Sequence, residues 1–406
     1  MTEGTKATAA DIFIPPPEQP VMEAPDGIRF DFNDGLRVQF PKEGGPWHIT
    51  FKDMDAGIIL GDGDAEPGSF VASVKKYFVR FSVTIWRKGE SAPIFEHEFN
   101  AQGQAVMVQM PVPTLGDTLA WFPYIAKFRR QHGCRMLAVL QPQFIEILQR
   151  QYPEIGFITR EQAAKTRSYA TYRLGLFFGG DVDHQPCDFR LVGLAQTAGH
   201  ILGVDPKPER PRFDLSAPRT IKEPYVCISV QSTSQCKHWN NPAGWHQVID
   251  FLKASGYRVL CVDKARFHGA GLQWNHIPHG CEDFTGPLPL QERVNLIKDA
   301  DFFVGLASGL SWLAWGCDVL VVLISGFSYP LTEFQTPYRV INYHACNSCW
   351  NDPRYDFDHY DFLWCPRHKG TDRQFECTRL IAGEQVINTI KKIPIFQDHI
   401  RKRQSA

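Results

Sequence analysis

Apolar residues recur along this chain with two different periods. Between Gly27 and about Gln104 they alternate with polar residues in short runs, at 28–32, 36–40, 47–51, 78–86 and 94–99. Turn sequences such as Asn33-Asp34-Gly35 separate these runs. Alternation with a period of two, broken by such turns, is typical of β-hairpins. This part of the chain is therefore predicted to form a small all-β domain.

Beyond Gln104 the pattern changes to alternating strands and helices. We expect helices over 119–131, 243–255 and 290–298, and buried strands at 106–110, 136–140, 225–230, 257–262, 301–305 and 319–324. Two βαβ blocks joined by a polar, Pro-rich segment, 205–224, predict two doubly wound domains that face each other across a cleft. The predicted organisation is a flexible tail at 1–25, an all-β domain at 26–104 and Rossmann-like domains at 105–216 and 217–406.

Composition and charge narrow the class of protein. The 406 residues carry a net charge of -1, so no overall positive field would attract nucleic acid or an anionic membrane. The Pro-rich start lacks the basic and apolar regions of a signal peptide. The longest apolar stretch, near 319–324, is far shorter than the roughly 20 residues of a membrane span. We therefore expect a soluble, cytoplasmic protein with no transmembrane segment and no nucleic-acid partner.

Four cysteines gather near the end of the chain, at Cys346, Cys349, Cys365 and Cys377. The C-x2-C pair lets two sulfurs reach one ion, and four thiolates can complete a tetrahedral shell around zinc or iron. Two disulfides or four unrelated thiols are the alternatives, but thiols stay reduced in a cytoplasmic protein. The pattern predicts an inserted metal finger at 343–380. Spacing alone does not choose the metal, and zinc is the default.

Three loops at predicted strand ends could carry chemistry. Asp117 lies in the first, just where a helix begins, either as a helix-capping acid or as a general base. Lys237 lies in the second, 232–239, where hydroxyls, amides and an ammonium could bind a diphosphate, although a solvated loop is the alternative. The third, 305–312, is a small-residue turn whose backbone amides could bind a phosphate.

In this order, the three loops resemble those of the bacterial heptosyltransferases, which are glycosyltransferases of the GT-B type with two Rossmann-like domains. Gly116-Asp117 matches the place of the family's base, and Lys237-His238-Trp239 matches its nucleotide-sugar loop. Ala307 and Trp312 stand where the family has an Asp and a His, so the sugar hydroxyls of the donor must be held differently.

The all-β domain and the four-cysteine loop are similar to those of one branch, the autotransporter heptosyltransferases. This resemblance implies an inverting transfer from ADP-heptose to Ser hydroxyls of an autotransporter adhesin passenger domain. It also implies structural iron (Fe³⁺) on the four cysteines, no catalytic metal, and a large ring-like homo-oligomer such as a dodecamer.

The resemblance assigns a role to residues in all three loops. Asp117 is the expected base. The residues implied in donor binding are Thr114, Leu115, Gly116, Thr118, Ser232, Thr233, Lys237, Asp263, Leu288, Ser308, Gly309, Leu310 and Trp312. A lipopolysaccharide-type heptosyltransferase or another ADP-sugar glycosyltransferase is the alternative enzyme. A metal-binding assembly protein is the alternative without catalysis.

Overall fold

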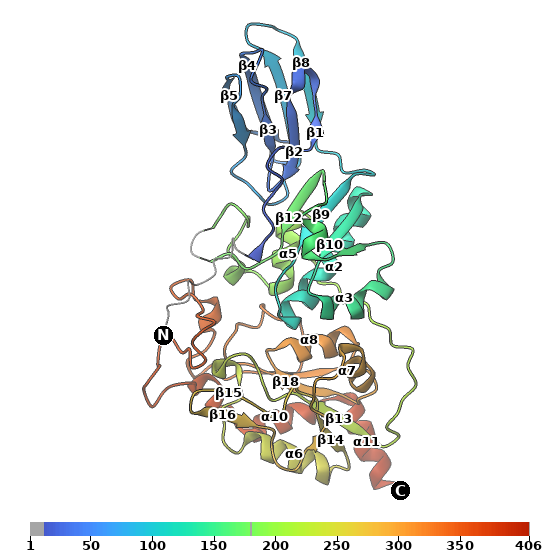
Figure 1. The fold of residues 1–406 in the computed structure, drawn as a ribbon. Helices are drawn as coiled ribbons and strands as arrows, with labels where there is room; N and C mark the ends of the chain where they lie inside the picture. Colours follow the sequence, from blue (N-terminus) through green and yellow to red (C-terminus); the bar gives the residue numbers. More distant parts are fainter. Residues whose placement is uncertain (1–11, 179–180, 406) are drawn as a thin grey trace.

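The computed structural model describes residues 12–178 and 181–405. These residues form an elongated molecule with three parts stacked along its length (Figure 1). An antiparallel sheet lies at the top of Figure 1, a first α/β unit in the middle and a second α/β unit at the bottom. The expected β region and the two expected α/β units are therefore present in the predicted order.

The antiparallel sheet has the strand order β5-β4-β7-β8. Its strands are β4 (Trp47–Asp53), β5 (Ile58–Ala65), β7 (Phe81–Arg87) and β8 (Pro93–Glu98). In β7 the side chains of Phe81, Val83 and Ile85 are buried, and those of Ser82, Thr84 and Trp86 between and after them are only partly buried. This is the pattern of a strand with one face on a core, and it confirms the period-two prediction.

The first α/β unit has a sheet with the order β11-β10-β9-β12-β2-β3-β6, and β1 pairs with β2. The strands are β1 (Met22–Glu23), β2 (Arg29–Asn33), β3 (Arg37–Gln39), β6 (Phe70–Ala72), β9 (Ala105–Gln109), β10 (Arg135–Val139), β11 (Gly156–Ile158) and β12 (Ala170–Arg173). The strands from β11 to β2 run parallel.

A buried polar group joins β2 to this sheet. The Asn33 amide donates to the backbone oxygen of Ser168 at 2.7 Å and accepts from Thr171 Oγ1 at 2.6 Å. Hydrogen-bonded strands therefore cross the boundary expected near residue 104, because β2 and β3 extend the α/β sheet. The division into domains stays a prediction.

Residues 12–25 differ from the flexible tail that the sequence predicts. Phe13 is buried and its ring stacks on Phe177, with 6.0 Å between the ring centroids. Ile14 exchanges two hydrogen bonds with the buried side chain of Gln109. The two apolar residues before the Pro run bury surface that a free tail would expose, which corrects the prediction for this segment. Residues 1–11 lie outside the described residues.

The second α/β unit has a parallel sheet with the order β17-β14-β13-β18-β19-β20. Its strands are β13 (Tyr225–Ile228), β14 (Arg258–Cys261), β17 (Glu282–Asp283), β18 (Phe303–Leu306), β19 (Val321–Ile324) and β20 (Arg339–Val340). A separate hairpin consists of β15 (Phe267–Ala270) and β16 (Gln273–His276). All residues of β13, β18 and β19 are buried, as their continuous apolar runs predict.

Helices cover the sheets and form the contact between the two α/β units. Those of the first unit are α2 (Leu115–His132), α3 (Pro142–Leu148), α4 (Arg160–Ala163) and α5 (Leu194–Leu202). Those that follow are α6 (Gly244–Ala254), α7 (Leu290–Ile297), α8 (Gly309–Gly316), α9 (Glu376–Arg379), α10 (Gly383–Ile390) and α11 (Pro394–Gln404). The expected helices at 119–131, 243–255 and 290–298 are confirmed as α2, α6 and α7.

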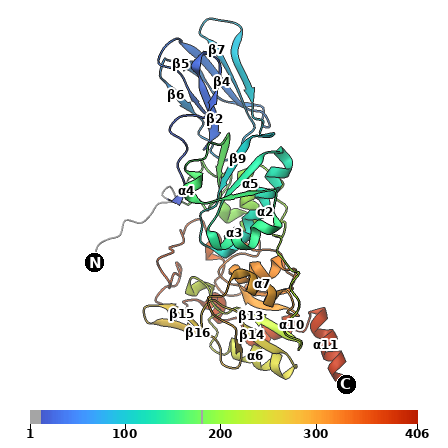
Figure 2. The same cartoon turned by 45° about the vertical axis from the view of Figure 1, so that its right-hand side comes forward.

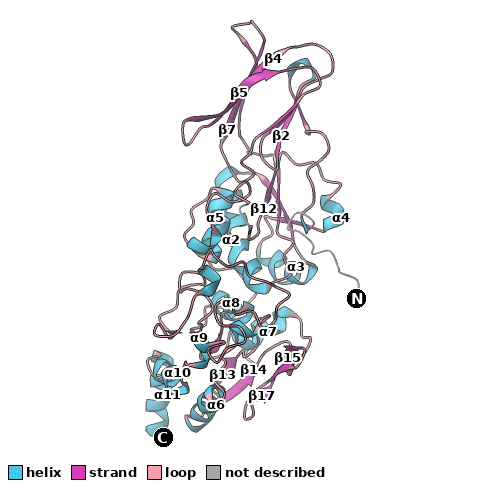
Figure 3. Cartoon of the chain, turned by 90° about the vertical axis from the view of Figure 1, so that its left-hand side faces the viewer, coloured by secondary structure: helices cyan, strands magenta, loops and turns pink. Residues whose placement is uncertain are grey.

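The units meet where α2 packs on α8 and α3 packs on α7. Figure 3 shows these four helices between the two sheets, and Figure 2 shows α11 at the far end of the second unit. One hydrophobic core continues across the contact, from Val106 of β9 to Trp312 of α8. Among the described residues, each helix is too short or too polar to cross a bilayer.

Candidate active site and metal centre

The first turn of α2 places Asp117 at the contact between the units. Thr114 occupies the N-cap position, but its hydroxyl does not accept a hydrogen bond from the helix backbone. It donates to Asp117 Oδ2 instead. The hydroxyl of Thr118, which is also a predicted donor-binding residue, donates to the Thr114 backbone oxygen at 2.9 Å. The two threonines thus fix the helix start and the orientation of the carboxylate.

Burial raises the pKa of the Asp117 carboxyl above its usual range. The hydrogen bond from Thr114 and the charges of Lys237 and His359 act in the opposite direction. A carboxylate with a raised pKa is a stronger base than an exposed one, and this is the property that a general base requires.

The predicted phosphate loop follows β13 and ends at Lys237. The Ser232 backbone N–H donates to His238 Nε2 at 3.0 Å, which closes the loop on itself. Burial lowers the pKa of His238 to about 4, so its ring is neutral and can accept this bond. Thr233 is exposed and Lys237 is partly buried. The loop therefore has a fixed backbone and two side chains, Thr233 and Lys237, that remain accessible.

The first turn of α8 lies directly against the first turn of α2. A Cβ at Gly309 would lie 2.7 Å from the Leu115 Cβ and 3.0 Å from the Gly116 nitrogen. A Cβ at Gly116 would lie 3.2 Å from Trp312 Cδ1. The first amides of a helix have no partner inside the helix, so two electropositive helix starts converge here.

Ser308 and Trp312 frame this contact on the α8 side. The Ser308 hydroxyl is buried and has no hydrogen-bond partner among the described residues. Trp312 is buried, and its ring centroid lies 5.1 Å from that of Phe334. Leu310 is partly buried on the same turn. An unsatisfied buried hydroxyl at a helix start indicates a place for a polar ligand atom.

Asp263 and Leu288 occupy other positions. Asp263, after β14, accepts from Ser229 Oγ and from the Val230 backbone N–H, both at 2.7 Å. Its carboxylate is therefore occupied internally and ties down the start of the Lys237 loop. Leu288 precedes α7 and is 37% exposed. A part in donor binding stays a prediction for both residues.

His359 belongs to this site although the sequence did not single it out. Burial lowers the pKa of His359, the charge of Lys237 lowers it further, and the charge of Asp117 opposes the shift. His359 lies in the metal finger, more than a hundred residues from either partner. A lone His in a Tyr- and Asp-rich loop carries no motif, so only the folded chain could reveal it.

The four predicted metal ligands line one small cavity together with His368 and Glu376. All four are free thiols in the structure, with no disulfide among them. Arg367 donates to Cys346 Sγ at 3.5 Å, as cations near thiolate ligands commonly do. Thiolate, imidazole and carboxylate donors are therefore all present at this cavity, and the donor set fits zinc or iron.

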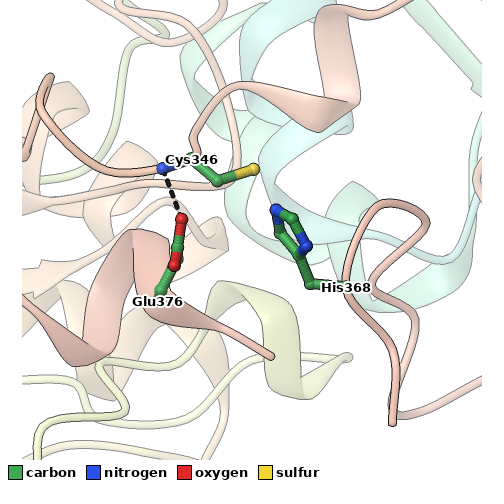
Figure 4. A group of neighbouring side chains, drawn as sticks. All are labelled: Cys346, His368 and Glu376. Atoms are coloured by element: carbon green, nitrogen blue, oxygen red, sulfur yellow. Dashed lines mark hydrogen bonds between the residues drawn. The ribbon is translucent and has the colours of Figure 1, made fainter. Parts of the chain in front are cut away.

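Cys346, His368 and Glu376 offer a second possible ligand set, with ligand atoms that lie within 4.8 Å of one another. Figure 4 shows the Cys346 sulfur pointing toward the His368 ring, and Glu376 beside the Cys346 backbone. Glu376 accepts from the Cys346 N–H at 2.9 Å and forms two hydrogen bonds with Arg373. The Arg373 bonds and the Cys346 N–H hold its pKa at about 2. With its oxygens thus engaged, Glu376 is better suited to supporting Cys346 than to binding an ion.

Comparison with known proteins identifies the family of this chain. Residues 24–89 match the family described as glycosyltransferase TibC, N-terminal domain, and residues 191–355 match glycosyltransferase family 9 (heptosyltransferase). An autotransporter heptosyltransferase of Citrobacter rodentium is 55% identical over 384 residues, which cover 95% of this chain and 93% of that protein. The chain belongs to the autotransporter heptosyltransferases.

A solved structure of this heptosyltransferase family supports the fold. TibC of enterotoxigenic Escherichia coli, described as an iron-containing dodecameric glycosyltransferase, matches with a TM-score of 0.90 at 53% identity, over 93% of this chain and 98% of that one. TibC has also been solved in complex with ADP-D-β-D-heptose. The expected GT-B architecture with two Rossmann-like units is thereby confirmed.

Not every member of the family is an active enzyme. BimC of Burkholderia thailandensis is described as an inactive autotransporter heptosyltransferase, and it is 42% identical over 96% of this chain and 91% of its own.

The contact between α2 and α8 can be tested by adding one methyl group. Gly309→Ala should force Leu115 and Gly116 away from α8, and we expect a cost of about 1–3 kcal/mol. Gly63→Ala is the matched control, because no heavy atom lies within 4 Å of its new Cβ. Thermal unfolding at equal protein concentration should show a lower midpoint for Gly309→Ala alone. Equal midpoints for the two variants would show that the glycine contact is not tight.

Proposed function

We propose that this autotransporter heptosyltransferase transfers heptose from ADP-heptose to Ser hydroxyls of an autotransporter adhesin passenger domain, with inversion at the anomeric carbon. The observation that supports it most strongly is the position of Asp117. A partly buried carboxylate lies at the start of one helix, within the electrostatic reach of Lys237, and a second helix start packs against that first turn. A base and an anion site are thus neighbours across the contact of two Rossmann-like units.

In the proposed step, Asp117 takes the proton of the acceptor hydroxyl as its oxygen attacks the anomeric carbon of the heptose. The bond from that carbon to the β-phosphate oxygen breaks, and its electron pair leaves with ADP. A positioned base contributes roughly 10²–10⁴-fold to such a reaction. The Lys237 ammonium and the α8 amides at Ser308, Gly309 and Leu310 stabilise the charge that develops on the diphosphate.

The alternative is a metal-binding assembly protein without transferase activity, and it is specific because one relative is described as an inactive autotransporter heptosyltransferase. Two features favour an enzyme. Asp117 has a raised pKa, which a merely structural acid does not need, and Ser308 keeps an unsatisfied hydroxyl at the start of α8. Burial of a charge costs stability, and such costs are usually tolerated at functional sites.

Asp117→Asn tests the proposed base. The variant should lose transfer and keep its affinity for ADP, because the amide has a similar shape but cannot accept the proton. Its thermal midpoint at neutral pH should equal or exceed that of the unmodified protein, since the buried charge is removed. Mass spectrometry of a co-expressed Ser-rich passenger fragment would detect added heptose. Transfer at an unchanged rate in Asp117→Asn would refute the assignment.

The pH dependence of kcat/KM gives an independent check on the same residue. Only the ionised carboxylate can act as the base, so activity should be lost as the pH falls through the raised pKa of Asp117. That loss should occur above the value of about 3.9 that is usual for an exposed aspartate. An acidic limb at the ordinary value would contradict the burial that the structure shows at Asp117.

We also propose that Cys346, Cys349, Cys365 and Cys377 hold a structural iron ion, and that the protein forms a large homo-oligomeric ring such as a dodecamer in the cytoplasm. The iron-containing dodecameric TibC supports both. Reduced thiols throughout the chain agree with a reducing compartment. When bound, the ion would fix the finger, and no step of the transfer needs it.

Single substitutions distinguish the two ligand sets. Cys365→Ser should abolish metal binding, whereas His368→Ala should keep it, because His368 is not a ligand in the proposed site. Cys187→Ser is a control at a thiol outside the finger. Elemental analysis should find about one iron per chain in the control. Metal kept in Cys365→Ser and lost in His368→Ala would assign the site to Cys346, His368 and Glu376 instead.

A further inference from the structure

The side chain of Lys237 ends among three aromatic rings. Its ammonium nitrogen lies 5.1 Å from the ring centroid of Phe327, 5.9 Å from that of Trp350 and 5.3 Å from that of Phe357. The three rings also contact one another, with centroid separations of 5.4 to 5.5 Å. Together they form a closed triangle, here named the aromatic cage, and all three are buried.

The aromatic cage fixes the cation without neutralising it. In the described part of the chain, the lysines that pair with carboxylates are Lys75, Lys88, Lys298 and Lys369, and Lys237 is not among them. A carboxylate partner would compete with a bound diphosphate for the ammonium. Ring faces attract a cation through their quadrupole and carry no net charge. The full positive charge of Lys237 therefore remains available to an anion.

The metal finger supplies two rings of the aromatic cage, Trp350 and Phe357, and contacts the backbone beside the third, Phe327. Trp350 directly follows Cys349, and its backbone N–H donates to the Phe327 oxygen at 3.1 Å. Behind Phe327, the backbone of Gly326 lies so close to Cys377 that a Cβ there would be 2.5 Å from the Cys377 oxygen. Phe357 lies between the second and third cysteines in the sequence. The position of each ring thus depends on the fold of the finger.

A second contact joins the finger to the Lys237 loop itself. Cys236 packs in the same buried cluster as Cys349, Phe327 and Phe357. The Gln235 backbone N–H donates to the Phe362 oxygen of the finger at 2.9 Å. The finger therefore contacts both the backbone of the loop that carries Lys237 and, through Trp350 and Phe357, its ammonium group.

We propose that Phe327, Trp350 and Phe357 are positioning residues that hold the Lys237 ammonium at the diphosphate site of the nucleotide-sugar donor. This assignment rests on the proposed function, because it takes Lys237 as the residue that contacts the diphosphate. It gives the metal finger a role in donor binding: the finger presents the lysine through the rings that it carries.

A double-mutant cycle on ADP affinity tests the aromatic cage. Phe357→Leu keeps an apolar side chain but removes the ring face, so its ADP Kd should rise about 3- to 10-fold. On the Lys237→Ala background the same change should alter the Kd by less than about twofold, because the cage would act only through the ammonium. Phe357→Tyr should keep the ADP affinity of the unmodified protein, since it keeps an aromatic ring at this position. Isothermal titration calorimetry measures the ADP Kd of the unmodified protein and of each variant.

Tyr360→Leu is the control within the finger. The Tyr360 side chain is 74% exposed and makes no cation–π contact with Lys237. We expect an unchanged ADP Kd in this variant, and an unchanged metal content in every variant, which separates ring loss from finger loss. An equal effect of Phe357→Leu with and without Lys237, or no effect at all, would overturn the proposal. An unchanged Kd in Lys237→Ala alone would instead refute the role of the lysine in the proposed function.

Discussion

The approach of α8 to α2 at Gly309 and Gly116 is the constraint on which the rest of the site depends. The absence of a side chain at Gly309 lets the α8 backbone contact Leu115 and the Gly116 nitrogen. This contact brings Asp117, from the first α/β unit, next to the start of α8 in the second, which is the proposed anion site. Each unit alone would hold only half of the machinery for transfer. The hydrophobic core that continues to Trp312 packs the two α/β units against each other.

The electrostatics of the site follow from this closeness. Burial raises the pKa of Asp117, and the charges of Lys237 and His359 partly oppose this shift. The Lys237 ammonium is surrounded by aromatic rings, which hold it in place without neutralising its positive charge. The site therefore holds a carboxylate, the proposed base, and a cation near each other, with neither neutralised by a tight ion pair. The metal finger contributes here by folding its aromatic residues against the lysine.

The sequence predicted those parts of the fold that local patterns encode. Continuous apolar runs identified β13, β18 and β19, and the glycine- and serine-rich turn identified the start of α8. It could not predict that β2 would join the first α/β sheet, because that pairing depends on the buried side chain of Asn33 meeting Ser168. The tail prediction failed at Phe13 and Ile14 because two apolar residues beside a Pro run give no periodic signal. His359 and the aromatic cage were missed because their meaning lies in contacts with residues far away in the sequence.

In the proposed reaction Asp117 activates the acceptor hydroxyl on one side of the anomeric carbon, and Lys237 stabilises the leaving diphosphate on the other. A structure of this protein with ADP-heptose, or with an unreactive analogue of it, tests this arrangement most directly. We expect the diphosphate to contact Lys237 and the backbone amides of Gly309 and Leu310, with the anomeric carbon facing the Asp117 carboxylate. A diphosphate bound away from the start of α8, or a sugar on the far side of Lys237 from Asp117, would contradict this arrangement.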